Sequence, residues 1–517
     1  MFTKLRHAIA RAIAPRMVAV RQYAAARYSR LSLGFGISST TADSELRTSL
    51  AALRNRSRQL IRDSAYAKRA QAIVVNNVIG AGVGMQAQVM TTRNVLAEAV
   101  NDAIESAWHD WSRAENCHTG GALHFGDLER AGMGQVFAAG EVFVRKHPRP
   151  FGRSRVPLAI ELIEAERIAD EYNGVSDVGN SIRNGVEVDG FERPVAYFVR
   201  RRHPGDVLTV STQADQIERI PAEQILHVKL TNRWPQTRGE PWMHAAILKL
   251  NDMAEYTAAE LAAARASANY FGTIESNDDN PLAATETEDG AQFYDIQPNV
   301  IQKLTPGDKF NFHAPNRPNA ALDPFMRHML REVAAAVGVS YESLSRDYSQ
   351  SNYSSSRLAL LDDRDTWRVL QQWWVRSFRE PLHREWLRAA VLARSVQGIS
   401  LEAYGNDMQR YEAVRFKPRG WSWVDPTKEV EAYKAAELAG YITKTQIIAQ
   451  TANGLDIEDV INERRRELDM LKAADIETDT TTPAARPAPA PTPPPPPDDA
   501  EDDTPQEPPA RLFSFPR

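Results

Sequence analysis

Apolar residues recur at helical spacing over much of the chain. The first such region, residues 44–79, predicts one long helix with arginines on its polar side. Its apolar face is formed by Leu46, Leu50, Leu53, Leu60 and Ile61. A glycine-rich turn, VIGAGVGMQ, follows, and helical spacing resumes over residues 95–111. We therefore expect the start of the chain to be mainly helical.

Between about residues 140 and 230 the pattern changes to that of strands. GEVFVRK alternates apolar and polar residues, PLAIELIEAERI is strand-like, and ILHVKL ends the region. GVEVDGFERPVAYFV predicts a hairpin that turns at Asp189-Gly190. Strands and helices in separate runs indicate an α+β fold.

Two helices with an insert between them form the next region. An alanine-rich helix is expected over residues 241–271, with a proline in its first turn. Residues 272–320 break the helical pattern with an acidic loop and two short strands, AQFYDI and DKFNFH. Asp323 and Pro324 are typical of a helix cap and first helical residue, and this helix should end near Gly338.

The least usual segment is SLSRDYSQSNYSSSRLALLDD, residues 343–363. It is polar and dotted with tyrosines, yet it separates two predicted helices. The second of these helices has apolar residues at four-residue spacing: Leu370, Trp374, Phe378 and Leu382. Further helices are expected over residues 426–471, whereas the proline-rich tail from about residue 475 cannot bury enough apolar surface to fold.

Charge is unevenly distributed along the chain. The 517 residues are 43% hydrophobic and 25% charged with a net charge of −5, which argues against a protein that coats nucleic acid through bulk positive charge. Residues 1–42 are basic with no acid before Asp43, and residues 498–507 are almost purely acidic. We interpret the start as a basic surface arm, with a transit peptide as the alternative, because Arg11 and Arg16 interrupt any secretory signal. No apolar run is long enough for a membrane span.

Motifs of catalysis are mostly absent from the sequence. The glycine-rich turn resembles a dinucleotide loop, but G-x-G-x-x-G counted from Gly80 would need glycine where Met85 stands, so a plain turn is the better interpretation. No G-K dipeptide occurs, which excludes a Walker A loop in this chain. Cys117, the only cysteine, permits no intrachain disulfide and makes only a weak zinc candidate with His118 and His124.

Three carboxylates leave an alternative open. Asp362, Asp363 and Asp365 could bind the metal of a nuclease. They alternate with Arg364 and Arg368, however, and this favours a salt-bridged helix face. We therefore predict that the chain is not an enzyme and needs no cofactor or metal. A metal-dependent DNA-processing enzyme is the alternative.

Four long blocks of sequence carry a resemblance. They are LAALRNRSRQLIRDSAYAKRAQAIVVNNVIGAGVGMQ at 50–86, RNGVEVDGFERPVAYFVRRRHPGD at 183–206, QILHVKLTNRWPQTRGEPWMHAAILKL at 224–250 and VGVSYESLSRDYSQSNYSSSRLALLDDRDTW at 337–367. In this order they resemble the lambda-type family of phage portal proteins, and the resemblance covers roughly residues 45–440.

The resemblance implies a dodecameric ring at one vertex of a tailed-phage capsid. Double-stranded DNA would enter through this channel during packaging and leave through it at infection. The terminase would dock on the ring and supply the ATP-driven work, which fits the missing Walker A loop. The other implied partners are the major capsid or scaffold protein and a head-completion or tail connector protein, without any membrane. The implied location is the virion, after assembly in the host cytoplasm.

The resemblance also implies a division of the chain into the parts of a portal fold. The expected parts are a basic N-terminal arm (1–44), a mixed wing (45–240), the first stem helix (241–271), a clip (272–320), the second stem helix (321–339), a tunnel loop (340–357), helices that return to the wing (358–425), a helical crown (426–474) and an acidic proline-rich tail (475–517).

The DNA-channel residues are expected in the tunnel loop, at the narrowest point of the channel. They are Arg346, Tyr348, Gln350, Asn352, Tyr353, Ser354, Ser355 and Arg357. Their hydroxyl, amide and guanidinium groups can make brief contacts to sugar and phosphate without reading sequence. The alternative is a capped surface loop in which Ser354 or Ser355 only starts the next helix.

The acidic insert is the expected contact for the terminase or the connector protein. Its carboxylates are Glu275, Asp278, Asp279, Glu286, Glu288 and Asp289. A plain solvated loop is the alternative for this segment. For the whole chain, a head–tail connector protein that is not a portal is the second alternative function.

Overall fold

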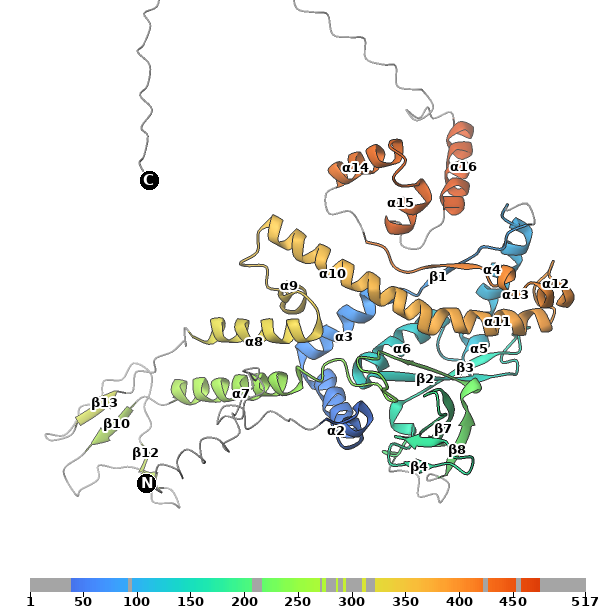
Figure 1. Cartoon of the computed structure of the whole chain (residues 1–517). Helices are drawn as coiled ribbons and strands as arrows, with labels where there is room; N and C mark the ends of the chain where they lie inside the picture. The colour runs from blue at the N-terminus through green and yellow to red at the C-terminus, as the bar shows by residue number, and fades with distance from the viewer. Residues whose placement is uncertain are drawn as a thin grey trace, which may run out of the picture. The chain divides into compact units, whose positions relative to one another are not determined.

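The structure of the protein is a computed structural model. It describes residues 39–91, 95–206, 216–269, 321–421, 426–451 and 457–474, together with four short strands between residues 272 and 312. The elements up to residue 451 belong to one compact unit, and α16 (Ile457–Ala473) belongs to a second unit and is described by itself (Figure 1). None of the described helices is both long enough and apolar enough to cross a bilayer.

The first helical region consists of two helices, α2 (Ala42–Asp63) and α3 (Ala65–Val78). The prediction of one continuous helix over residues 44–79 is therefore wrong. Ser64 between them has an extended backbone with φ −103° and ψ 125°, and its hydroxyl accepts a hydrogen bond from the Ala67 amide (3.5 Å). A serine in this conformation is a favourable N-cap, so the chain ends one helix and starts the next at this residue.

The glycine-rich turn after α3 is a turn and not a dinucleotide loop. Gly80 and Gly82 have positive φ values of 66° and 126°, a region that glycine enters without strain. The chain then enters β1 (Gly84–Ala87), which pairs antiparallel with β14 (Val414–Lys417). This pairing with a strand more than 300 residues away differs from the strand–turn–helix unit that a dinucleotide fingerprint needs.

Two antiparallel sheets fill the region that the sequence predicted as strands. The first sheet has the order β3-β2-β9, from β2 (Glu141–His147), β3 (Ala159–Ile163) and β9 (Ile225–Lys229). The second has the order β4-β5-β6-β7-β8, from β4 (Gly174–Val175), β5 (Ser181–Arg183), β6 (Val186–Val188), β7 (Pro194–Arg200) and β8 (Ile217–Pro221). Antiparallel sheets beside separate runs of helices confirm the α+β class.

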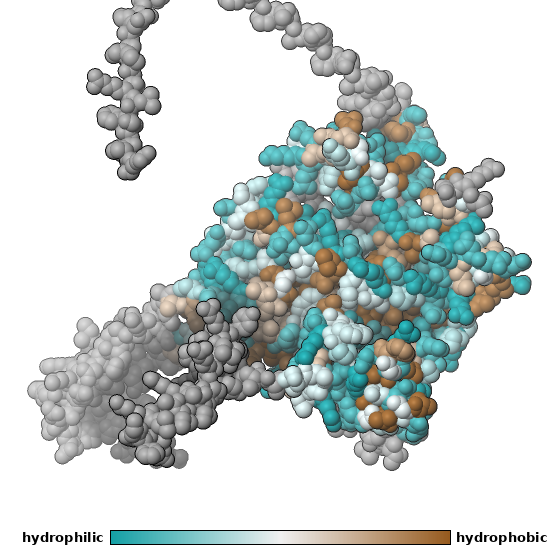
Figure 2. All heavy atoms as spheres, in the orientation of Figure 1, coloured by the Kyte–Doolittle hydropathy of each residue, from teal (hydrophilic) through white to brown (hydrophobic). Residues whose placement is uncertain are grey.

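The predicted hairpin turn lies where the sequence placed it, between β6 and β7. The Asp189 carboxylate accepts hydrogen bonds from the amides of Phe191 (2.8 Å) and Arg193 (2.9 Å). An aspartate that bonds its own downstream backbone stabilises a turn in this way. Figure 2 shows apolar atoms gathered on the lobe that carries these strands, which includes the highly exposed side chains of Val175, Val178 and Phe191.

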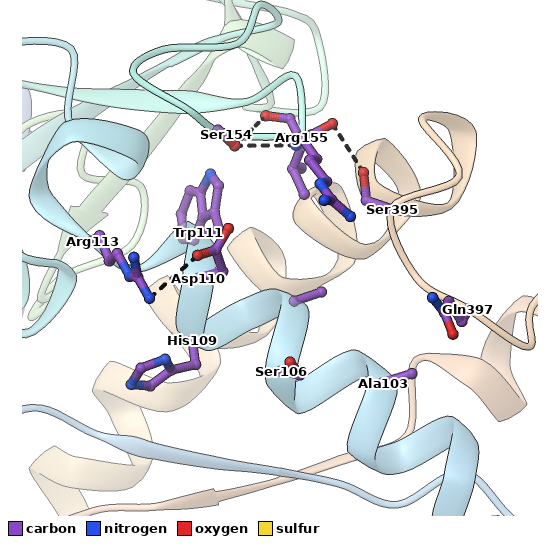
Figure 3. A pocket seen from close by; sticks show the side chains of 12 residues that line it. Ala103, Ser106, His109, Asp110, Trp111, Arg113, Ser154, Arg155, Ser395 and Gln397 are labelled. Carbon is purple, nitrogen blue, oxygen red and sulfur yellow. Dashed lines mark hydrogen bonds and ion pairs between the residues drawn. The ribbon is translucent and has the colours of Figure 1, made fainter.

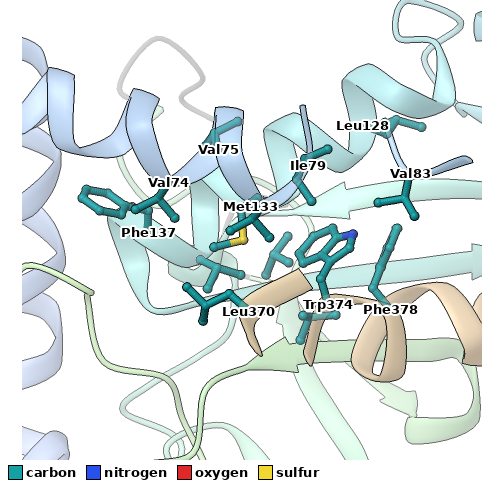
Figure 4. Close-up of a cluster of buried hydrophobic side chains, with 14 of the residues drawn as sticks. Val74, Val75, Ile79, Val83, Leu128, Met133, Phe137, Leu370, Trp374 and Phe378 are labelled. Carbon is teal, nitrogen blue, oxygen red and sulfur yellow. The ribbon is translucent and has the colours of Figure 1, made fainter. Parts of the chain in front are cut away.

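The main core lies between the helices around β2. The helices α4 (Glu98–Trp111), α5 (Ala114–Cys117) and α6 (Phe125–Ala139) precede that strand, and α6 contacts α2, α3 and β2. Figure 4 shows Trp374 surrounded by side chains that include Ile79, Met133 and Phe378. The Trp374 indole is fully buried and donates to the Glu129 carboxylate (3.1 Å), so its polar atom is satisfied within the core.

The two helices around the insert are α7 (Ile247–Asn269) and α8 (Leu322–Val337), which contact each other (Figure 1). Both start at residues other than those predicted. Residues 242–246 form turns, so α7 begins at residue 247, six residues later than predicted. α8 already includes Leu322, so Asp323 is not its cap. Asp323 instead accepts a hydrogen bond from Arg327 one turn later (3.0 Å). The predicted end is confirmed, because Gly338 has a φ of 78°.

Short strand pairs lie between these two helices. β10 (Gly272–Glu275) pairs antiparallel with β13 (Lys309–Phe312), and β11 (Thr285–Glu286) with β12 (Gln292–Phe293). The strands confirm that the insert contains β structure. Of the six acidic residues predicted here as partner contacts, Glu275 and Glu286 lie in strands, and the other four, Asp278, Asp279, Glu288 and Asp289, lie outside the described residues.

A long helical run follows α8. It consists of α9 (Tyr341–Ser345), α10 (Tyr353–Trp374), a π-helical segment (Val375–Arg379) and α11 (Glu380–Leu392). The apolar face that the sequence predicted is confirmed, since Leu370, Trp374, Phe378 and Leu382 are all buried. The chain continues through α12 (Leu401–Asn406), α13 (Met408–Tyr411), α14 (Pro426–Leu438) and α15 (Lys444–Thr451).

Candidate functional site

The polar segment between α8 and α10 is more ordered than the sequence suggested. Tyr341–Ser345 forms α9, and residues 353–357 are the first turn of α10, so the loop itself is limited to residues 346–352. Arg346 ends α9 in the left-handed region, with a φ of 58°, and its amide donates to the Glu342 carbonyl (2.9 Å). The candidate tunnel loop is therefore about seven residues long rather than the predicted eighteen.

Asp363 holds the start of α9 in place. Its carboxylate accepts hydrogen bonds from the Ser340 amide (2.9 Å), the Ser340 hydroxyl (2.7 Å) and the Ser343 hydroxyl (3.0 Å). Asp365 pairs instead with Arg368 (2.7 Å), and Asp362 is exposed. Asp363 and Asp365 thus have separate partners, and among the described residues only Glu164, Glu166 and His203 lie close enough to share an ion.

The loop ends at a capped helix. The Asn352 side chain accepts from the Ser355 amide (2.8 Å), and the Ser355 hydroxyl accepts from the Asn352 amide (3.1 Å), which makes a reciprocal capping box. The sequence allowed Ser354 or Ser355 as the cap, whereas the cap is Asn352 with Ser355 as its partner. These two residues are held by the helix start, so they are less free to contact DNA than predicted.

The remaining predicted channel residues differ in how free they are. Arg346, Gln350 and Ser354 are exposed, and Tyr348 and Tyr353 are each 59% exposed. Arg357 is only part-exposed and lies 3.9 Å from Glu429 on α14. The side chains available to a ligand are thus one guanidinium, two phenols, one amide and one hydroxyl: Arg346, Tyr348, Tyr353, Gln350 and Ser354.

Asp347 ties the loop to α8. Its carboxylate accepts a hydrogen bond from the Tyr341 hydroxyl (2.9 Å) and lies 3.6 Å from the Arg327 guanidinium. Hydrogen bonds from Ser349, followed by those from Tyr341 and the charge of Arg327, lower the pKa of Asp347 to about 2. The only carboxylate in the loop is therefore already held by other groups. The Asp-x-Ser spacing is the one sequence signal for this contact, and we did not predict it.

A buried ion network joins β2 and β9 to the segment before α7. The Arg238 and Glu141 side chains are both fully buried, with Arg238 Nε 2.9 Å from Glu141 Oε1. The other Glu141 oxygen accepts from the Gly239 amide (2.8 Å) and contacts His227 (2.9 Å). Burial alone would raise the pKa of Glu141, but Arg238 and His227 outweigh burial and lower it.

The same network reaches α2 and the second sheet. Arg54 on α2 bonds the Asp170 carboxylate and the Ala165 carbonyl, and Arg238 bonds Asp170 and the Asn184 carbonyl. Five segments that are far apart in sequence therefore meet at two arginines. Sequence analysis missed this site, because nothing in the irregular stretch TNRWPQTRGE relates Arg238 to a carboxylate 97 residues earlier.

A second buried cation lies in the π-helical segment. Arg379 is fully buried, and its nearest carboxylate oxygen, on Glu129, is 3.8 Å away. Its guanidinium lies over the rings of Trp108 (4.8 Å), Phe125 (4.8 Å) and Phe416 (5.1 Å). None of its three side-chain nitrogens forms a hydrogen bond with a described residue, so aromatic faces are its main partners.

His383, one turn after Arg379, is also buried without a hydrogen bond from either ring nitrogen to the described residues. Burial, and then the nearby charges of Arg379 and Arg384, lower its pKa from 6.5 to about 3. The pKa of His227 is also lowered from 6.5, to about 4, chiefly because of burial. Both imidazoles are therefore held neutral in the folded chain at pH values where an unfolded histidine would gain a proton.

These two histidines predict a loss of stability in acid. Because the folded pKa lies below the unfolded value, the stability is complete above pH 6.5 and is lost as the pH falls towards 3 for His383. His383 alone should remove about 2 kcal/mol between pH 6.5 and about pH 5, at about 1.4 kcal/mol per unit. His383→Phe should flatten the pH dependence of the urea midpoint, and His109→Phe, an exposed control, should not. Equal pH profiles for His383→Phe and the parent would refute the assignment.

The weak zinc candidate is not assembled as a site. The Cys117 thiol is buried and donates to the Ser112 carbonyl (3.4 Å), and burial raises its pKa to about 12. His118 Nδ1 accepts from backbone amides, and His124 Nδ1 accepts from the Gly126 amide at the start of α6 (3.2 Å). Each of the three side chains thus has a local structural partner.

A polar cavity of about 510 Å³ lies between α4 and the segments near Ser154 and Ser395. Figure 3 shows the side chains that line it. Asp110 and Arg113 form an ion pair across 3.5 Å, and the Ser395 hydroxyl donates to the Arg155 carbonyl (2.9 Å). The His109 ring points away from this ion pair in Figure 3. Among the described lining residues, no hydrogen bond joins the His109 ring to a serine hydroxyl, which is the contact between base and nucleophile that a hydrolase of this kind uses.

Comparison with known proteins identifies the family of the chain. Residues 28–371 match the profile of a family described as phage portal protein, lambda family. The chain is 29% identical over 431 residues to a probable portal protein of Halomonas phage phiHAP-1, covering 81% of this chain and 80% of that protein.

Two further relatives are more distant. Identity to the portal protein of Escherichia phage N15 is 23% (63% of this chain, 66% of that one). Identity to portal protein B of Escherichia phage lambda is also 23% (58% of this chain, 62% of that one). The chain thus spans less than two thirds of the lambda protein's length.

Solved structures resemble the chain only loosely. A chain from the neck of an empty gene transfer agent particle is 13% identical, with a TM-score of 0.41 over 76% of this chain and 92% of that one. A chain from a native virion of a gene transfer agent is 15% identical, with a TM-score of 0.37 over 80% and 94%. At these TM-scores the assignment depends on the sequence matches. Since the family profile matches well over half of its residues, the chain belongs to the lambda family of phage portal proteins.

Proposed function

We propose that copies of the chain form a dodecameric ring whose channel conducts double-stranded DNA into and out of a phage capsid. The observation that carries this proposal is the loop of residues 346–352. It presents one exposed cation with phenol and amide groups, while its only carboxylate, Asp347, is engaged by Tyr341 and Ser349. A DNA-facing loop without a free negative charge can contact phosphates and does not repel them.

The contacts offered by the loop are suited to sliding. Tight binding of DNA depends on many cations, each of which releases counterions from the phosphates. The free side chains of the loop include only Arg346 as a cation, so a ring of copies would present one positive charge per subunit. Hydroxyl and amide groups from Tyr348, Gln350 and Ser354 would add exchangeable hydrogen bonds. Such a lining positions DNA without holding it.

The loop is supported by α8 and α10. Asp347 connects it to Arg327 on α8, and the Asn352–Ser355 capping box starts α10 at its other end. We assign α7 and α8 to the stem, the strand pairs between them to the clip, and the long helix from Tyr353 to Leu392 to the return into the wing. The helices after Pro426 would form the crown.

The partners follow from the same assignment. The acidic residues of the clip, Glu275, Asp278, Asp279, Glu286, Glu288 and Asp289, are the proposed contact for the terminase or for a head-completion or tail connector protein. The exposed apolar side chains on the lobe of β4–β8 fit a contact with capsid or scaffold protein, since such clusters often mark protein interfaces. The ring would assemble in the host cytoplasm and remain in the virion.

A terminase-driven packaging reaction tests this function. Capsids assembled with the chain should protect duplex DNA from nuclease, because the DNA enters through the ring. Capsids assembled without it should protect none. Equal protection in both reactions would contradict a role as the packaging channel.

A further inference from the structure

Positive charge is concentrated on α2 and α3. Between residues 47 and 69 these helices carry seven cationic residues and a single carboxylate, Asp63, whereas the whole chain has a net charge of −5. The cations are Arg47, Arg54, Arg56, Arg58, Arg62, Lys68 and Arg69. Arg54 is used by the buried network, but most of the others are at least partly exposed. The local excess of charge is therefore available to a partner.

Four cations line a cavity of about 640 Å³ between α2, α3 and α6. They are Arg58, Arg62, Lys68 and Arg130. The other polar lining residues include the amides Gln71, Asn76 and Gln135, and no carboxylate is part of the lining. A cavity of this size, lined by guanidinium, ammonium and amide donors, fits a phosphate group with its sugar.

The charges of these four cations are compensated to different degrees. Arg58 is neutralised by Glu166 (2.6 Å), which fixes its position. Among the described residues, Arg62 pairs with its exposed neighbour Asp63 alone (2.8 Å), and surface pairs of this kind contribute about 0–1 kcal/mol. An incoming phosphate can therefore replace Asp63 with little loss of stability.

The positive charges of the other two cations, Arg130 and Lys68, are not compensated by a carboxylate of any described residue. The Arg130 guanidinium donates to the Gly80 carbonyl and to Asn76 Oδ1 (3.0 Å), both of which are neutral acceptors. Lys68 is exposed and forms no ion pair with any described residue. The cavity thus holds a rigid guanidinium and a free ammonium on neighbouring helices, without a carboxylate that balances them.

We propose that this cavity binds backbone phosphates of double-stranded DNA, as a second contact separate from the loop of residues 346–352. The exposed cations of α2 extend beyond the cavity to Arg47, which lies about three turns before Arg58 on the same helix face, and a row of cations fits a polymer with repeated phosphates better than a small anion. Lys68 is one residue, or about 100° of helical rotation, from Arg69, which bonds the Ser343 carbonyl beside the loop. The two contacts therefore use different faces of α3.

Salt-dependent binding tests this inference on the full-length protein. A fluorescent DNA duplex would be titrated with the parent and with the double variant Arg62→Ala, Lys68→Ala between about 0.05 and 0.2 M salt. Each lost phosphate contact reduces the magnitude of the slope of log affinity against log salt by about 0.9. The double variant loses about two contacts, so its slope should be smaller by about 1.8. Its affinity should fall on the order of tenfold or more. Lys68→Arg, which keeps the charge, should bind like the parent.

Arg388→Ala is the matched control, since it removes an exposed cation from α11, outside the cavity. It should leave the slope unchanged. An unchanged slope in the double variant, or an equal loss in the control, would overturn the proposal. So would loss of ring assembly in the double variant, because the cavity would then serve contacts between copies.

The inference rests on the proposed function only in naming DNA as the polyanion, and the two can fail separately. If capsids assembled with the parent chain fail to package DNA while the double variant still shows a smaller salt dependence than the parent, the channel assignment is wrong and the proposal for the cavity is still supported. If packaging works and the slopes are equal, only the cavity is wrong.

Discussion

Replacement of Glu141 by alanine should lower the free energy of unfolding by about 3–5 kcal/mol. Glu141 is fully buried, and its removal leaves the equally buried Arg238 with the partly exposed Asp170 as its remaining carboxylate partner. It also removes the acceptor of the Gly239 amide and the partner of His227. A fully buried cation that loses its buried carboxylate is far more unfavourable than a lost surface contact, so the urea midpoint should fall strongly.

Asp365→Ala provides the comparison for this result. Asp365 also accepts from an arginine, Arg368, at 2.7 Å, but both side chains are more than half exposed. The same loss of a carboxylate should therefore change the free energy of unfolding by about 1 kcal/mol or less. Similar urea midpoints for the Glu141 and Asp365 variants would show that the buried network does not hold β2, β9 and the segment before α7 together as described.

The double variant Arg346→Ala, Gln350→Ala should reduce packaged DNA on the order of tenfold while rings remain intact. A charge-assisted hydrogen bond contributes about 1.5–3 kcal/mol, which corresponds to about tenfold or more in an equilibrium. Both side chains are exposed, so their removal should not disturb the fold. Nuclease-protected DNA in a packaging reaction is the measurement.

Asn352 should be left in place in this experiment. It caps α10, and its replacement by alanine would cost about 1 kcal/mol of helix stability. A packaging defect could then come from the destabilised helix instead of a lost DNA contact. Arg376→Ala is the better control, because it removes an exposed arginine from the same helical run, where it bonds only Gln372. Normal packaging by the loop variant, or an equal defect in the control, would contradict the proposal that the loop of residues 346–352 contacts DNA.

Much of the fold could be predicted from periodicity. The alternation of GEVFVRK correctly predicted β2. The four-residue spacing from Leu370 to Leu382 correctly predicted the buried face of the long helical run. These signals are local, since each depends on which side of one element is buried. The insert of short strands between α7 and α8 was also predicted, because its composition interrupts two helical patterns.

The errors arose where a helix end depends on one side chain or on distant packing. Ser64 divides the first helical region by capping α3, a role that its neighbours in sequence do not reveal. The turns before α7 replace the expected helical start, and the preceding Arg238 is held by Glu141. Propensity therefore predicted many elements with ends displaced by up to six residues, but it joined α2 to α3 and did not predict α6.

In the candidate site, too, local features could be predicted from the sequence and features that depend on folded contacts could not. Its position and polar character were predicted, but the roles within it were not. Asn352 was predicted as a DNA contact and also caps α10, whereas Asp363 was expected on a salt-bridged helix face and instead holds α9 through Ser340. Both corrections come from contacts that depend on folded geometry. The buried Arg379 shows this most clearly, since its aromatic partners come from three distant segments.

The most direct test is electron microscopy of the full-length protein, at a resolution that traces the chain. We expect a closed ring with an axial channel, in which residues 346–352 of every copy lie closest to the axis. A compact particle, or a thin ring without a wing, would contradict the channel proposal. A ring with this loop on its outer surface would contradict the assignment of the loop as the DNA contact.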